Sequence, residues 1–327
     1  MGVAVELFES LDAAAAAAGA ALERENQPEV FSRLSWFRLL AEHCPPRGKL
    51  LVAKAGNSWL LLAAQGRRGG AYANWYSLRA GLIGDPAGAE AIAGALRKRL
   101  SSIEISPVAE PEGLTRGLKA AGWMVQVSPA TASWRIATAG MVFAAYWSSR
   151  PSQLRNSAER KAKAAELDIR IYRSFDAGAW ADYQSVYAAS WKPQEGSPAF
   201  LRALAEQEGA AGTLRLGIAR KGGQAVAAQL WLVENGIATI HKLAYREDAR
   251  ALSPGTVLSM AMFRAALDED RVHLIDYGTG DEPYKADWMD TRHVLWRVEA
   301  WDPRSIAGLF GVARAGASHL VRRLRSR

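Results

Sequence analysis

The stretch DYGTGDEPYKADW, residues Asp276–Trp288, decides the fold, because it turns a buried strand into a polar loop. Residues 272–275, just before it, are mainly apolar and predict a short buried strand. Gly278 and Gly280 then free the backbone for a sharp exit. Acidic, phenolic and amine side chains follow in close succession. A simple turn does not need such a concentration of reactive groups, so the sequence indicates a site where this strand ends.

A second strand and a helix precede this stretch. Residues 236–245, GIATIHKLAY, alternate as a strand does, and LSPGT at 252–256 begins a helix that runs to about Leu267. Ser253 suits the N-cap, proline suits the first helical position, and Gly255 lets a ligand approach the backbone closely. Unpaired N–H groups in such a first turn attract an anion. The alternative interpretation is an ordinary helix cap.

This order of strand, helix, strand and polar loop resembles the acyl-CoA-binding half of the GNAT acyltransferase fold. The SPGT helix start and the YGTGDEPYKADW motif are similar to those of the CelD-like GNAT family, which is related to the FemAB transferases. The resemblance covers roughly residues 150 to 300. It implies that acyl-CoA is a co-substrate, that no cofactor is tightly bound, and that the CoA pyrophosphate lies on Ser253, Gly255, Thr256 and Val257.

The expected fold class is α/β, with two tandem GNAT-like domains whose mixed, mostly antiparallel sheets are flanked by helices. Gly56-Asn57, Gly222-Gly223 and Asn235-Gly236 predict hairpin turns between strands. An alanine-rich helix, capped by Ser10 or Asp12, is expected to end near Glu25. We expect a diverged, non-catalytic GNAT-like domain at 1–148, the catalytic domain at 149–303 and a basic amphipathic helix at 304–327.

His241 lies in the middle of a strand, where two interpretations remain open. A lone histidine in a strand is commonly a core residue. In GNAT folds, however, the matching strand separates from its neighbour to admit the thioester. An imidazole, with an ordinary pKa of about 6.5, can accept a proton from an ammonium group. The neighbours predicted to share the face of His241 are Thr239, Leu243 and Tyr245.

The resemblance also gives roles to residues of the exit loop. It makes Asp281 a base or amine binder, Tyr284 an acid toward the leaving thiolate, and Lys285 an anion-binding or motif-stabilising residue. The alternative is a turn with exposed acids followed by the start of a helix. The expected substrate-binding residues are Arg155, Lys242, Tyr245, Asp276 and Trp288. For Arg155 the alternative is a solvated helix face, since Glu159 follows at salt-bridge spacing.

Composition describes a globular chain with a sizeable core. Of 327 residues, 49% are hydrophobic, and 41 Lys and Arg against 33 Asp and Glu give a net charge of +8. This charge favours an anionic partner. A single cysteine, Cys44, excludes an internal disulfide, and no His/Cys cluster has metal-ligand spacing, so we expect no metal. The acidic start lacks the pattern of a signal peptide, which predicts a cytoplasmic protein.

These observations predict an acyl-CoA-dependent N-acyltransferase that acts on an amine of an envelope precursor, either a long-chain sphingoid-type amine or an amino sugar. One alternative is a FemAB-like transferase that uses aminoacyl-tRNA. Another is a non-catalytic scaffold of an envelope-synthesis complex. We expect no DNA partner. The apolar residues of the basic tail after Asp302 fall mainly on one side. This pattern predicts either binding to an anionic membrane surface such as the inner membrane or a packed C-terminal helix.

Overall fold

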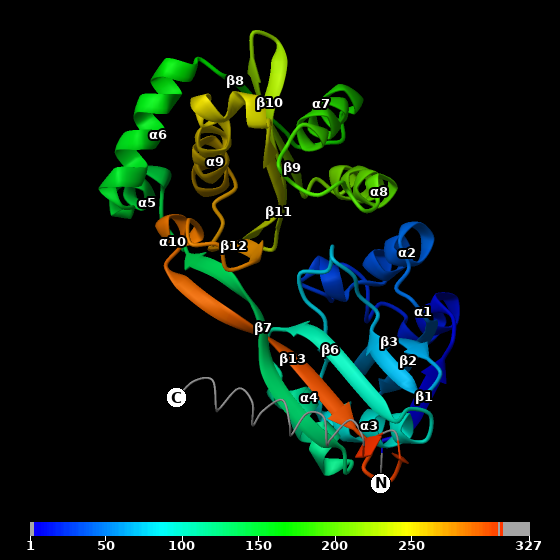
Figure 1. Cartoon of the computed structure of the whole chain (residues 1–327). Helices are drawn as coiled ribbons and strands as arrows, with labels where there is room; N and C mark the ends of the chain where they lie inside the picture. The colour runs from blue at the N-terminus through cyan, green and yellow to red at the C-terminus, as the bar shows by residue number, and fades with distance from the viewer. Residues whose placement is uncertain (1–2, 307, 310–327) are drawn as a thin grey trace. The chain divides into compact units, whose positions relative to one another are not determined.

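The computed structural model describes residues 3–306 and 308–309, which form two compact units (Figure 1). Unit 2 is Ala132–His293, and unit 1 holds the described residues up to Thr131 and from Val294 onward. The sequence instead favoured a boundary at residue 148. The units begin and end inside strands, because β7 (Met124–Ala137) and β13 (Thr291–Trp301) each start in one unit and finish in the other.

The sheet of unit 2 is a mixed one. Four antiparallel strands come first, β12 is parallel to β11, and the end of β7 pairs antiparallel with β12. The strands are β8 (Asp168–Tyr172), β9 (Leu214–Lys221), β10 (Gln224–Glu234), β11 (Ile237–Tyr245) and β12 (Leu274–Thr279). The predicted turns are confirmed: Gly222 and Gly223 join β9 to β10, and Asn235 and Gly236 join β10 to β11, all with positive φ.

Helices cover both faces of this sheet. Figure 1 shows α6 and α9 on one side and α7 and α8 on the other. The helices of unit 2 are α5 (Phe143–Ser149), α6 (Ser152–Ala165), α7 (Ala177–Ala188), α8 (Pro198–Ala210), α9 (Pro254–Arg264) and α10 (Lys285–Trp288). A short 3₁₀ helix, η3 (Glu247–Leu252), precedes α9, and a π-helical segment, η4 (Ala265–Glu269), follows it.

Unit 1 repeats the same pairing order. Its strands are β1 (Val5–Phe8), β2 (Lys49–Ala55), β3 (Ser58–Gln65), β4 (Arg68–Ala71), β6 (Ser102–Val108) and the end of β13, with the short β5 (Ile83–Gly84) beside β3. The first four strands are antiparallel, β6 is parallel to β4, and β13 is antiparallel to β6. This repeated pairing order within a mixed sheet flanked by helices confirms the predicted fold class.

The last strand of each sheet is exchanged between the units. β7 follows β6 along the chain but pairs with β12, whereas β13 follows β12 but pairs with β6. Neither half can therefore complete its sheet from its own consecutive sequence. Unit 1 adds helices α1 (Leu11–Ala18), α2 (Leu34–His43), α3 (Ala89–Arg97) and α4 (Glu112–Ala120), with 3₁₀ turns η1 (Val30–Ser32) and η2 (Pro86–Gly88).

The alanine-rich helix is shorter than its composition predicts. α1 ends at Ala18, and Gly19 follows with φ of 52° and its N–H bonded to the Ala15 carbonyl. A glycine in this conformation stops a helix. The prediction that the helix reaches Glu25 is therefore wrong, since alanine propensity alone does not outweigh this stop.

Aromatic side chains form the centre of the unit 2 core. Phe263 of α9 packs on Trp231 and Trp288 with ring centroids 5.3 and 5.0 Å apart, and stacks on Tyr146 at 5.1 Å. Trp288 is buried, and its carbonyl accepts a hydrogen bond from the Tyr146 hydroxyl. Trp288 is thus a core residue, which argues against its predicted contact with substrate.

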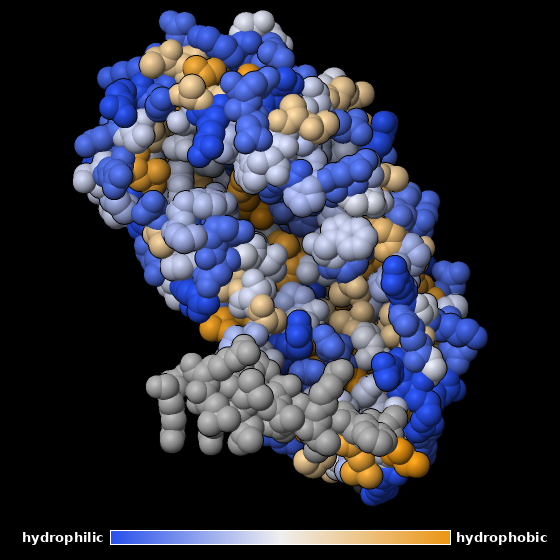
Figure 2. Space-filling model, in the orientation of Figure 1, coloured by the Kyte–Doolittle hydropathy of each residue, from blue (hydrophilic) through white to orange (hydrophobic). Residues whose placement is uncertain are grey.

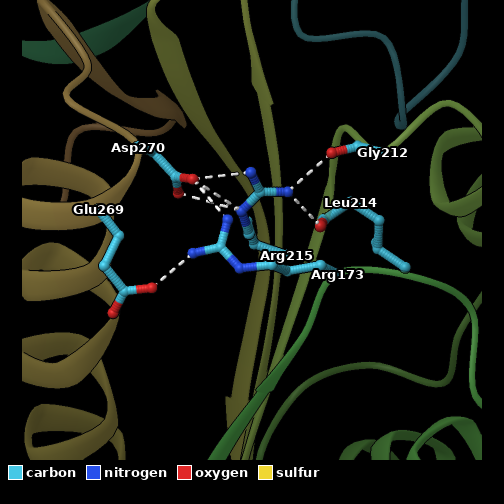
Figure 3. Close-up of polar contacts among 6 residues, drawn as sticks. All are labelled: Arg173, Gly212, Leu214, Arg215, Glu269 and Asp270. Atoms are coloured by element: carbon cyan, nitrogen blue, oxygen red, sulfur yellow. Dashed lines mark hydrogen bonds and ion pairs between the residues drawn. The ribbon is translucent and has the colours of Figure 1, made fainter.

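A buried ion pair fixes the far end of α9 (Figure 3). The Arg215 guanidinium bonds Asp270 through Nη2 at 2.7 Å, while its Nη1 donates to the carbonyls of Gly212 and Leu214. Arg173 adds a second bond to Asp270. Burial raises the pKa of the Asp270 carboxyl, but the bonds from both arginines outweigh it and hold this pKa below its ordinary value. These contacts join η4 to β8 and β9.

Candidate functional site

The strands β11 and β12 pair over only part of their length. The recorded register has three residue pairs and ends with Thr239 opposite Asp276, whereas β11 continues to Tyr245 and β12 to Thr279. Beyond Thr239, the edge of β11 that faces β12 therefore has no strand partner in the recorded pairing. Unpaired strand edges bind extended ligands through backbone groups. Of the predicted site residues, His241, Lys242 and Tyr245 lie on this part of β11.

A β-bulge places His241 at the start of the opening. On β10, Leu230 pairs with Lys242 and Trp231 pairs with Ile240, so His241 is the extra residue. The bulge also changes which residues share a face. Ile240 and Leu243 both pack in the core beside α9, so the alternation predicted for this strand fails here. His241 itself is buried.

The first turn of α9 has fewer open donors than expected. Ser253 is the N-cap residue, in the left-handed region with φ of 52°, and its side chain makes no capping bond. Its carbonyl instead accepts from the N–H groups of Thr256 at 3.1 Å and Val257 at 3.2 Å. Pro254 has no N–H, so Gly255 carries the first-turn donor for which no acceptor is recorded in the described chain.

Two aromatic rings lie beside this turn. Trp191 packs against Tyr245 with ring centroids 4.3 Å apart, and Tyr245 lies so close to Gly255 that an added Cβ would be 3.0 Å from its ring. The loop that carries Trp191 is tied to the end of β11 by a bond of 3.1 Å from Glu247 N to Ala189 O. Tyr245, predicted to bind substrate, therefore forms one wall next to the helix start.

A chain of hydrogen bonds runs from the interior to Tyr284. The Gln229 amide donates to Ser259 Oγ at 2.8 Å, Ser259 bonds the buried Tyr277, and Tyr277 bonds Tyr284. Ser259 donates to Tyr277, and Tyr277 donates to Tyr284. The hydroxyl proton of Tyr284 is therefore not used within this chain and can be donated to a ligand. Burial is the main cause that raises the pKa of Tyr284 to about 12. Tyr284 therefore keeps its proton at neutral pH, as an acid must.

Lys285 holds the exit loop together. Its buried ammonium donates to the carbonyls of Thr279 at 2.9 Å and Gly280 at 3.2 Å, and it pairs with Glu282 at 2.9 Å. Gly280 has φ of 116°, and a Cβ there would meet Glu282 and Lys285 within 2.9 Å. These contacts fit the motif-stabilising role predicted for Lys285 and explain the glycine beside it.

A second group of charges near this loop joins Lys242, predicted to bind substrate, to Lys192 and Glu195, which were not predicted. Lys192, in the loop between α7 and α8, lies over the Trp191 ring at 5.8 Å. Burial, followed by repulsion from Lys242, lowers the pKa of Lys192 to about 8. Lys242 pairs with Glu195 at 3.3 Å, so its ammonium is held by that carboxylate. Only tertiary structure brings these lysines together, since no motif surrounds Lys192 in the sequence.

The two aspartates predicted to serve the acceptor are held in ion pairs. Arg292 bonds both carboxylate oxygens of Asp281, at 2.8 and 2.5 Å, and Trp134 donates to the same group. The bond from Arg292 lowers the pKa of Asp281, which makes it a weak base. Asp276 is buried and accepts from Ser133 at 2.6 Å and from Arg135 at 2.9 Å. The structure thus argues for structural roles.

Arg155 belongs to the basic helix α6. Its Nε donates to the Arg150 carbonyl at 3.1 Å, and Glu159 accepts from the indole of Trp147 instead of pairing with Arg155. In Figure 2 the surface over α6 is mostly hydrophilic. Lys161 of this helix donates to the Ala251 carbonyl, which lies just before α9. One cation of α6 is therefore joined to the segment that leads into the predicted pyrophosphate site.

Comparison with known proteins supports this assignment of elements. Residues 148–286 match the family described as Acetyltransferase (GNAT) domain. No curated protein sequence matches the chain. A similar solved structure is the C-terminal DUF2156 domain of an Agrobacterium fabrum protein described as a lysylphosphatidylglycerol synthetase. Its TM-score is 0.61 at 14% identity, over 94% of this chain and 97% of that one.

Two further structures have the same fold. FemX gives a TM-score of 0.55 at 10% identity over 81% of this chain and 94% of its own. A tandem GNAT protein from the clavulanic acid biosynthesis pathway gives 0.50 at 14% identity, over 90% of this chain and 98% of that one. The family match over residues 148–286 and the likeness to these structures together show that the chain has a GNAT-type fold.

Proposed function

We propose that the chain transfers an acyl group from acyl-CoA to the amine of an envelope precursor. The observation that carries this proposal is the opening between β11 and β12, which begins at the bulge at His241 and has the start of α9 beside it. The free edge of β11 suits the amide groups of the pantetheine arm, and Gly255 suits its pyrophosphate. Tight packing of Tyr245 near Gly255 leaves little space for a larger side chain at this position.

The chemistry needs a base and an acid on opposite sides of the thioester carbon. Lys192, with a pKa of about 8, is neutral often enough to accept a proton from the ammonium acceptor. His241 is the second candidate base, because it lies at the start of the opening. Tyr284 then donates its proton to the leaving thiolate, and the bond from Tyr277 stabilises the phenolate left behind.

Binding and turnover distinguish this proposal from its alternatives. Calorimetry should detect binding of CoA and of acyl-CoA. Release of the free CoA thiol should require an amine, which is tested with a panel of sphingoid bases and amino sugars. Likeness in fold to FemX supports the alternative in which aminoacyl-tRNA is the donor. Binding of charged tRNA without binding of CoA would favour that alternative. Binding of neither donor would favour the non-catalytic scaffold.

A membrane-bound acceptor remains part of the proposal. No helix in the described ranges is both long and apolar enough to cross a bilayer. The basic tail lies outside the described residues, except for its first few positions. Arginine near an anionic leaflet contributes about 1 kcal/mol each. We therefore expect the full chain to bind anionic liposomes at low salt and a chain truncated before Gly316 to lose this binding. A full chain that stays unbound would favour a soluble acceptor.

A further inference from the structure

Unit 1 contains a partly open cavity at the position that corresponds to the opening in unit 2. The parallel pair β4 and β6 has three recorded residue pairs, the last joining Gly70 to Glu104. The loop after β4 then leaves β6: Tyr72 N donates to Leu61 O of β3 at 2.9 Å, and Ala80 N donates to Pro107 O at 2.7 Å. A cavity of about 280 Å³ lies between these two contacts and α2.

The walls of this cavity combine charge with aromatic surface. Phe31, Trp36 and Phe37 form one side, and Tyr72, which is also buried, packs on Phe37 with ring centroids 6.4 Å apart. The charged residues on the wall are Glu29, Arg79 and Glu110. Arg79 Nη1 bonds Glu29 Oε1 at 2.5 Å, and their side chains are 12% and 35% exposed. A carboxylate and a guanidinium therefore line the same small cavity.

We propose that this cavity binds a small zwitterion with an aromatic body, of the kind represented by L-phenylalanine. Purely apolar cavities stay empty, whereas a polar cavity of this size holds water or a ligand. The Arg79 guanidinium suits a ligand carboxylate, and the Glu29 carboxylate suits an ammonium group. The aromatic walls suit a ring. The volume is at the lower end of ligand sites, which excludes a whole CoA. The proposal is independent of acyl transfer by unit 2.

Calorimetry on the full chain tests the proposal with three probes. L-Phenylalanine should bind, whereas phenethylamine, without the carboxylate, and 3-phenylpropanoate, without the ammonium, should each bind at least about tenfold more weakly, since each loses a charge-assisted bond. Equal binding of all three probes, or no binding of L-phenylalanine at millimolar concentration, would overturn the proposal.

Two variants locate the site. Arg79→Gln should weaken L-phenylalanine binding by at least about tenfold. Ala109→Phe, on the half-buried wall, should block binding while it leaves the ion pair in place. The control Arg38→Gln removes an exposed ion pair with Asp12 in the same unit and should leave binding unchanged. Circular dichroism establishes that each variant is folded. Unchanged affinity in a folded Ala109→Phe variant would place the ligand elsewhere and refute the assignment.

Discussion

Gly255 and Tyr245 are packed so closely that a Cβ added to the glycine would lie 3.0 Å from Cδ1 of the tyrosine ring. The ring has little freedom to move away, because Trp191 packs on it with centroids 4.3 Å apart. This contact sets the space above the start of α9, and it makes the glycine testable as part of a phosphate site.

Gly255→Ala should weaken CoA binding, since the ring must move or the phosphate must give way. We expect an increase in Kd of about tenfold, equivalent to about 1.4 kcal/mol, measured by calorimetry. Gly255→Glu should weaken it further through charge repulsion. The control is Gly94→Ala in α3, where a Cβ meets no atom within 4 Å. Unchanged CoA affinity in Gly255→Glu would remove the main support for this site.

Lys192 should make the reaction depend on pH. Its pKa is lowered to about 8, mainly by burial, and only the neutral amine accepts a proton, so kcat/KM should rise as the pH increases through about 8. Lys192→Met should lose about 10²- to 10⁴-fold in rate and abolish this limb of the profile. Lys221→Met, which removes a more exposed lysine paired with Glu166, should do neither.

His241→Ala separates the two candidate bases. If His241 only shapes the bulge, the variant should keep the limb near pH 8 with a lower rate. Loss of the limb in His241→Ala together with its retention in Lys192→Met would assign the base to His241 and contradict our prediction.

Tyr284→Phe should slow the chemical step. The phenol has a pKa of about 12 and is the last member of the hydrogen-bond chain, so its loss removes the proton for the thiolate. We expect kcat to fall by about 10²-fold with little change in the Kd of acyl-CoA. The fall in kcat should be larger for a thioester with a poor thiol leaving group than for one with a good thiol leaving group. Equal losses for both would show that Tyr284 does not act as the acid.

Asp281→Asn should leave the pH profile unchanged. The bond from Arg292 lowers the pKa of this carboxyl, so the aspartate stays ionised and paired over the working range. The measurement is kcat/KM from pH 6 to about 9, which spans the titration of ordinary histidine. A lost limb in this variant would return the role of base to Asp281.

Arg215→Ala should destabilise the fold by about 3 to 5 kcal/mol, because it leaves Asp270 buried without its main partner. Chemical denaturation measures the loss. The pKa of Asp270 is lowered in the folded state, so its contribution is complete above about pH 4 and declines as the pH falls below this value. The control Arg202→Ala removes an exposed ion pair with Glu206 and should lower the free energy of unfolding by less than about 1 kcal/mol.

The sequence predicted the parts of the fold that depend on local order. Apolar patterning predicted the strands at residues 236–245 and 272–275, and paired turn residues such as Asn235 and Gly236 predicted the hairpins, because positive φ is a local requirement. Proline after Ser253 likewise marked the start of α9. The family resemblance then linked this order of elements to acyl transfer, since composition alone does not predict a reaction.

Contacts between distant residues decided the rest. The exchange of β7 and β13 depends on pairing between strands far apart in the chain, which periodicity does not encode. The bulge at His241 follows from register against β10, so it reversed the predicted alternation. Asp281 loses its basicity to Arg292, and Lys192 gains its lowered pKa from burial and from Lys242. A side chain's chemistry depends on its desolvation and its charged neighbours, and only the folded chain fixes both.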